Sequence, residues 1–120
     1  MRVANERHVP IVARGAGKGT RVGLLFPNGI AAIEVLLAVA RIGALAMPLS
    51  TFLAPSELRH VLRHGDVQIL VVPPNLFGRD VDEVLVDVDP GLASAQQHEL
   101  RLPSLPYLRT VLVHGRAAGA

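Results

Sequence analysis

The sequence predicts an α/β protein with three layers, in which helices cover a mostly parallel sheet. Short apolar runs alternate with helical stretches, and residues 21–48 read as strand, turn, helix and strand. Half of the 120 residues are hydrophobic and 18% are charged, which suits one buried core. We therefore expect one domain, or part of one, over residues 21–114, with a poorly patterned lead-in (1–20) and a tail (115–120).

The first strand and helix dominate this pattern. An apolar run over Val22–Phe26 predicts a strand, and a turn follows. The helix is expected over Ile30–Ile42, with Asn28 as its N-cap and Gly43 in the left-handed position after its end. Because this helix is apolar almost all round, we expect it to be buried on more than one side.

The next elements follow without long loops. Residues Ala44–Met47 predict a second strand, which is expected to stop at Pro48. Residues Pro55–His64 predict a helix that begins with proline, whose missing amide costs nothing at the first helical position. Ala54 holds the expected N-cap position and has no side-chain acceptor, a weakness of about 1 kcal/mol.

The remaining chain predicts two more strands and a short helix. Residues Val67–Val72 are almost continuously apolar, which is typical of a central strand. An acidic amphipathic helix is expected over Asp80–Val88, and a last strand over Leu108–Val113. Residues 91–106 are polar and predicted to be irregular.

Composition excludes several functions. A net charge of +2 with scattered arginines and few aromatic residues does not predict nucleic-acid binding. There is no cysteine, and hence no disulfide framework or thiolate metal site. The apolar stretch Ile30–Leu49 contains Glu34 and Arg41, so no membrane span is predicted. No signal-peptide pattern is visible over Met1–Arg14, and we expect a cytoplasmic location.

Two glycine-containing segments resemble phosphate sites superficially. In residues 15–20 Lys18 is followed by Gly19, and the segment precedes a strand, whereas a phosphate-binding loop follows a strand and opens a helix. The turn at Asn28 and Gly29 has the right place, after a strand and before a helix. It offers only one glycine, and we interpret it as a turn with a helix cap.

Two clusters of titratable residues have side chains of the kinds that bind metals. His60 and His64 are one helical turn apart but lack the pattern of a zinc helix. An acidic run without a glycine-centred calcium loop is predicted to be a solvated helix face. This run consists of Asp80, Asp82, Glu83, Asp87 and Asp89.

The segment from Gly17 to Leu76 resembles the adenylate-forming superfamily, the AMP-dependent acyl-CoA synthetases and ligases, and most closely a bacterial fatty-acyl-CoA synthetase. The resemblance spans about three-quarters of the chain. It is carried by the runs Gly19–Gly29 (GTRVGLLFPNG), Leu37–Ala44 (LAVARIGA), Met47–Leu49, Pro55–Leu58 and Val61–Leu62, and by Leu102–Leu105 and Leu108–Val111 near the end.

The resemblance implies a known reaction for the superfamily, but it also implies that this chain lacks the motifs that carry out that reaction. Members of the superfamily activate a carboxylate with ATP and Mg²⁺ to an acyl-adenylate and transfer the acyl group to CoA. None of their catalytic motifs has a counterpart in this sequence. We therefore expect no catalytic, cofactor-binding or metal residue and no cofactor for this chain alone, which reads as an inactive N-terminal fragment. Ala54 departs from the family's usual Thr or Ser.

Two alternatives remain open. The chain could be an interaction module that complements another polypeptide or self-associates through apolar surface. It could also be a small nucleotide-binding α/β protein that uses Asn28 and Gly29 at a helix N-terminus.

Overall fold

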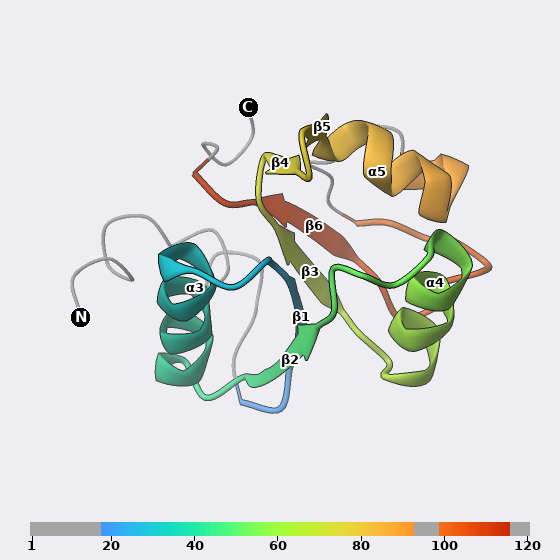
Figure 1. Cartoon of the computed structure of the whole chain (residues 1–120). Coiled ribbons are helices and arrows are strands. Elements are labelled where there is room, and N and C mark those ends of the chain that lie inside the picture. The colour runs from blue at the N-terminus through green and yellow to red at the C-terminus, as the bar shows by residue number, and fades with distance from the viewer. Residues whose placement is uncertain (1–17, 93–98, 116–120) are drawn as a thin grey trace.

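A computed structural model describes residues 18–92 and 99–115, so most of the expected lead-in and tail lies outside the described residues. Strands and helices alternate along the chain (Figure 1). Their bounds are β1 (Arg21–Leu25), α3 (Ile30–Arg41), β2 (Leu45–Leu49), α4 (Pro55–His64), β3 (Ile69–Val72), β4 (Asn75–Leu76), β5 (Arg79–Asp80), α5 (Val81–Val88), the 3-10 turn η1 (Pro90–Leu92) and β6 (Thr110–Val113).

Four of the strands form a parallel sheet in the order β2-β1-β3-β6. Leu24 of β1 pairs with Pro48 on one side and with Val71 on the other. Helix α3 covers one face of the sheet, and α4 and α5 cover the other (Figure 1). The predicted three-layer α/β fold and the central position of β3 are therefore confirmed.

The core consists of two clusters, one on each face of the sheet. Side chains alternate along a strand, and so neighbouring residues serve opposite faces. Leu24 packs into the cluster under α3, whereas Leu25 packs into the cluster under α4 and α5. The cluster under α4 and α5 is larger and reaches to Leu92 and Leu105 beyond the helices.

Helix α4 has the predicted bounds and the predicted weak start. Its N-cap is Ala54, which makes no side-chain capping bond. Glu57 compensates in part, because its carboxylate accepts a hydrogen bond from the amide of Ala54 at 2.8 Å. One of the orphan amides is thus satisfied from within the helix.

Asn28 is not the N-cap of α3, contrary to the prediction. The N-cap is Gly29, with φ 157° and ψ −175°, and no side chain caps the helix. That backbone region is almost restricted to glycine. The turn therefore depends on the conformational freedom of Gly29, and the side chain of Asn28 makes no capping hydrogen bond. At the other end Gly43 has φ 77°, as predicted.

Pro48 does not stop the second strand, which is also contrary to the prediction. Strand β2 continues through it to Leu49. The amide of Leu45 donates to Thr20 beside β1 at 2.8 Å, and alternation then points position 48 away from β1. Because β2 is an edge strand, the missing N–H of Pro48 removes no bond of the sheet.

Two strands are shorter than predicted, and one hairpin was not predicted. Val67 lies outside β3 because its amide donates to Leu62 at the end of α4. The short antiparallel pair β4 and β5 follows β3, with Phe77 and Gly78 at its tip. Both tip residues have positive φ, 51° and 78°, as a two-residue hairpin requires.

Within the described residues no helix is long and apolar enough to cross a membrane.

Candidate functional site

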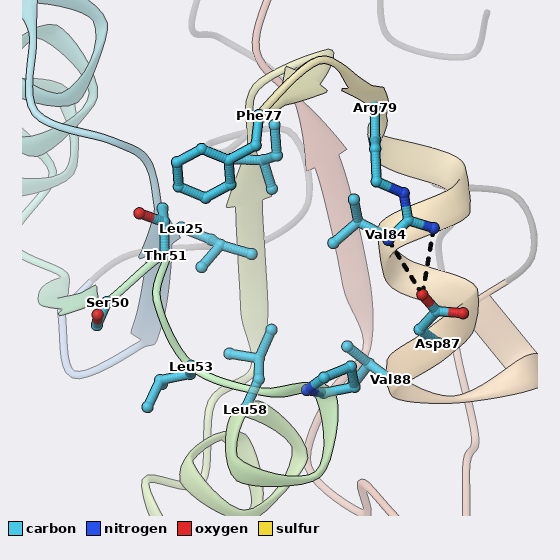
Figure 2. A pocket seen from close by; sticks show the side chains of 12 residues that line it. Leu25, Ser50, Thr51, Leu53, Leu58, Phe77, Arg79, Val84, Asp87 and Val88 are labelled. Atoms are coloured by element: carbon cyan, nitrogen blue, oxygen red, sulfur yellow. Dashed lines mark hydrogen bonds and ion pairs between the residues drawn. The ribbon is translucent and has the colours of Figure 1, made fainter.

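The carboxyl ends of the parallel strands are the usual place for a binding site in an open α/β sheet. On the side of α4 and α5 this edge holds a cavity of about 170 Å³ (Figure 2). Its apolar wall is formed by Leu25, Leu53, Leu58, Leu76, Val84 and Val88. These side chains come from β1, the β2–α4 loop, α4, β4 and α5.

The fold explains why these side chains meet. Leu25 is the last residue of β1 and faces α4. Leu58 lies in the first turn of α4 and is buried. Val84 and Val88 are one helical turn apart on α5, so that both point to the same side (Figure 2).

An ion pair lies on the α5 side of the cavity. Both terminal nitrogens of Arg79 donate to one carboxylate oxygen of Asp87, each at 3.2 Å (Figure 2). The two side chains are 50% and 47% exposed. Such an exposed pair adds less than about 1 kcal/mol to stability. Its consequence here is that the two charges at the cavity cancel.

Two exposed aromatic rings meet at the same edge. The ring of Phe77 lines the cavity, and the ring of Phe52 lies 5.9 Å from it, tilted by 36°. Their exposed fractions are 66% and 88%. The two rings therefore form a small exposed apolar patch at this edge.

A second groove lies on the α3 side, with a volume of about 340 Å³. It runs between α3 and the end of β2 and includes Ile33, Leu36, Pro48 and Asn28. The outward side of α3 continues it. There Ile30, Ile33, Leu36 and Leu37 are exposed. Helix α3 was expected to be buried on more than one side, but among the described residues only one side of it is covered.

The residues considered for phosphate and metal binding do not come together. Lys18 and Gly19 form a turn before β1, and the glycines that precede them lie outside the described residues. The rings of His60 and His64 are 4.1 Å apart on the exposed side of α4. No group of three or more metal-ligating side chains occurs in the described part of the chain.

Three residues of the acidic run make specific contacts, so the run is more than the solvated helix face that the sequence predicts. Asp80 caps α5 by accepting from the amide of Asp82 at 3.0 Å. Asp87 pairs with Arg79. Asp89 accepts from the amide of Gly91 at 2.8 Å and from the hydroxyl of Ser104.

The cavity lining is mostly apolar and holds few polar groups. Its described lining carries one carboxylate and one guanidinium, which neutralise each other, together with the hydroxyls of Ser50 and Thr51. Sequence reasoning missed it, because its wall is assembled from separate elements. One signal was available: Phe77-Gly78 is a two-residue hairpin tip with an unusual first residue.

The parallel sheet with helices on both faces places the chain in the α/β class, and solved structures of CoA ligases share its fold. A long-chain-fatty-acid-CoA ligase from Archaeoglobus fulgidus superposes with a TM-score of 0.71 at 22% identity, over 99% of this chain and 20% of that one. A second solved structure is that of a putative long-chain-fatty-acid CoA ligase from Rhodopseudomonas palustris. It superposes with a TM-score of 0.64 at 25% identity, over 98% of this chain and 24% of that one.

The family model for AMP-binding enzymes matches residues 11–115, and the chain belongs to this family. It is 35% identical to acyl-CoA ligase sidI of Aspergillus fumigatus over 67% of this chain and 14% of that protein. It is 31% identical to the mitochondrial medium-chain acyl-CoA ligase ACSF2 of mouse over 85% of this chain and 17% of the relative. The chain thus spans less than a fifth of these relatives. The resemblance read from the sequence is confirmed.

Proposed function

We propose that this chain forms the N-terminal part of the scaffold of a fatty-acyl-CoA synthetase, an acid–thiol ligase, and that it is catalytically silent alone. The observation that carries the proposal is the family match over residues 11–115 together with relatives named acyl-CoA ligases. Within it, residues 21–114 form the partial synthetase domain. In the whole enzyme the reaction activates a carboxylate with ATP and then forms the thioester.

The proposed lack of catalytic activity is supported by the side chains that line the cavity. The cavity lining in the described residues offers a neutralised ion pair and two hydroxyls, with no arrangement of nucleophile and base. The turn at Gly29 caps a helix and has a single glycine, which is poorly suited to a pyrophosphate. We therefore assign no catalytic, cofactor-binding or metal residue to this chain. ATP, Mg²⁺ and CoA belong to the proposed whole enzyme.

An ATP–pyrophosphate exchange assay on the purified chain tests this proposal. We expect no exchange above the buffer blank with saturated fatty acids of varied length, while a complete fatty-acyl-CoA synthetase exchanges in parallel. Exchange that depends on both fatty acid and chain concentration would overturn the proposed silence. A cytoplasmic location is part of the same proposal, and cell fractionation tests it.

A second function is favoured by the open side of α3: the chain acts as an interaction module that complements another polypeptide. Four exposed large apolar residues on one helix, beside a groove of about 340 Å³, form a patch of the kind that marks protein contacts. Size-exclusion chromatography with light scattering tests it. A monomer that binds no apolar dye at α3 would count against this second function.

A further inference from the structure

We propose that the cavity between α4, α5 and the end of β1 binds an uncharged molecule with a single aromatic ring, and that Phe77 contacts the ring. The inference does not rest on the proposed scaffold function. It combines four observations about one place: the volume of the cavity, its apolar wall, the neutral pair beside it, and an exposed aromatic side chain held in an unfavourable backbone conformation.

The volume sets the size of the ligand. The cavity measures about 170 Å³. An apolar protein cavity of about 150 Å³ is large enough to hold benzene. A single ring with a small substituent therefore fits, whereas two fused rings with substituents or a long alkyl chain would extend into solvent.

The wall and the ion pair set the ligand's charge. Leu25, Leu58, Val84 and Val88 offer no partner for a charged group, which would lose its hydration on entry. The only guanidinium in the described lining, that of Arg79, already pairs with Asp87 at 3.2 Å. Because these two opposite charges are already paired, the lining carries no net charge that would repay a charged ligand for its lost hydration, so a neutral ligand is favoured.

Phe77 indicates that the ligand is aromatic. Its φ of 51° is costly for a bulky side chain, and hairpin tips of this type normally carry Asn, Asp or Gly there. Burial does not repay this cost within the described residues, because Phe77 is 66% exposed. A ring placed against Phe77, with Phe52 only 5.9 Å away from it, would gain the tilted or offset contacts that aromatic groups prefer.

A titration with three probes of similar size tests the proposal. Benzyl alcohol, benzoate and cyclohexylmethanol are added to the full chain, and binding is followed by methyl NMR. We expect benzyl alcohol to bind with a dissociation constant of about 1 mM, which is reasonable for so small a ligand. Benzoate should bind at least about tenfold more weakly, and cyclohexylmethanol about threefold more weakly. Shifts should map to the methyls of Leu25, Leu58 and Val84.

Two variants separate binding from folding. In Phe77→Asn the tip gains a residue that tolerates positive φ and loses the ring, so the melting temperature should rise by about 3 °C while benzyl alcohol affinity falls about fivefold or more. Tyr107→Asn, at an exposed aromatic residue outside the cavity lining, should leave affinity unchanged. Val84→Phe should fill the cavity and abolish binding, whereas Val86→Phe on the exposed side of α5 should not.

Three results would each overturn the proposal. The first is benzoate binding as tightly as benzyl alcohol. The second is full affinity in Phe77→Asn or in a folded Val84→Phe. The third is a set of shifts confined to Ile33 and Leu36 of the groove beside α3, which would mean that benzyl alcohol only coats exposed apolar surface.

Discussion

The two faces of the sheet are built from the same strands but are covered very differently. On one face, α4, α5 and the segment around Leu105 enclose a cluster with many fully buried leucines and valines. On the other face α3 alone, among the described residues, lies over the strands, and its outward side leaves Ile30 and Ile33 in solvent, with exposed fractions of 77% and 57%. Within the described residues, helices cover the cluster on the first face. On the second face the covering helix, α3, is apolar both on the side that faces the sheet and on the side that faces outward.

This difference appears in one leucine from each face. Leu85 lies on the apolar side of the amphipathic helix α5 and is fully buried, whereas Leu37 lies on α3, which is apolar almost all round, and is 43% exposed. Stability should therefore depend on the face under α4 and α5. Association should depend on α3.

The largest expected effect is a loss of core packing on the face under α4 and α5. Leu85→Ala should lower the free energy of unfolding by about 2–5 kcal/mol, because it opens a cavity in the middle of the cluster. Leu37→Ala, the matched change on the outward side of α3, should cost about 1 kcal/mol or less. Urea unfolding of both variants measures the difference. Equal losses would show that the two faces do not differ in this way.

The next effect concerns the turn that joins α3 to β2. Gly43 has φ 77°, so Gly43→Ala should destabilise the chain by about 1–2 kcal/mol through backbone strain alone. Space is not the cause, because an added Cβ would meet its nearest neighbour, the Cα of Lys18, only at 3.8 Å. Gly43→Asn is the control and should cost less, since Asn tolerates this conformation. An unfolding midpoint unchanged by Gly43→Ala would contradict the assigned backbone.

A gain of similar size is expected at the start of α4. Ala54→Ser supplies the missing side-chain acceptor and should raise the free energy of unfolding by about 1 kcal/mol. The amide of Ala54 already donates to Glu57, so Ser completes a reciprocal pair of bonds. Thermal unfolding measures the gain. Ser56→Ala, next to the proline that opens α4, is a suitable control and should have little effect.

A substitution on the outward side of α3 should have the smallest effect on stability and the largest effect on association. Ile33→Gln should change the free energy of unfolding by less than about 0.5 kcal/mol, because the side chain is already mostly in water. It should also reduce apolar dye binding and any self-association through α3. Val86→Gln on α5 is the matched control, at an exposed apolar residue outside this patch, and should leave both unchanged.

Helix bounds were predictable because local signals coincide with them. Pro55 begins α4 and Gly65 follows its last residue, so the prediction was confirmed residue by residue. Sheet edges were less predictable. Whether a proline ends a strand depends on which side of that strand is paired, and Pro48 could be placed only once β2 was known to be an edge strand.

The cavity could not be predicted, for a different reason. Its wall joins residues separated by long stretches of sequence, and no motif relates Leu25 to Val84. The cap at α3 was wrong because Asn28 and Gly29 both suit a helix start by residue type. The choice between them depends on a backbone conformation that only Gly29 can adopt easily.

Pro48 also interrupts the edge of the sheet that β2 forms. Its ring occupies the outward position of β2, where a further strand would need an amide donor, so that only Ala46 offers an outward N–H in the middle of this edge. An incoming strand, whether from another molecule or from a misfolded copy, would find an interrupted template. The proline therefore protects one border of the sheet against fibre-like stacking, without any charged gatekeeper residue in the strand itself.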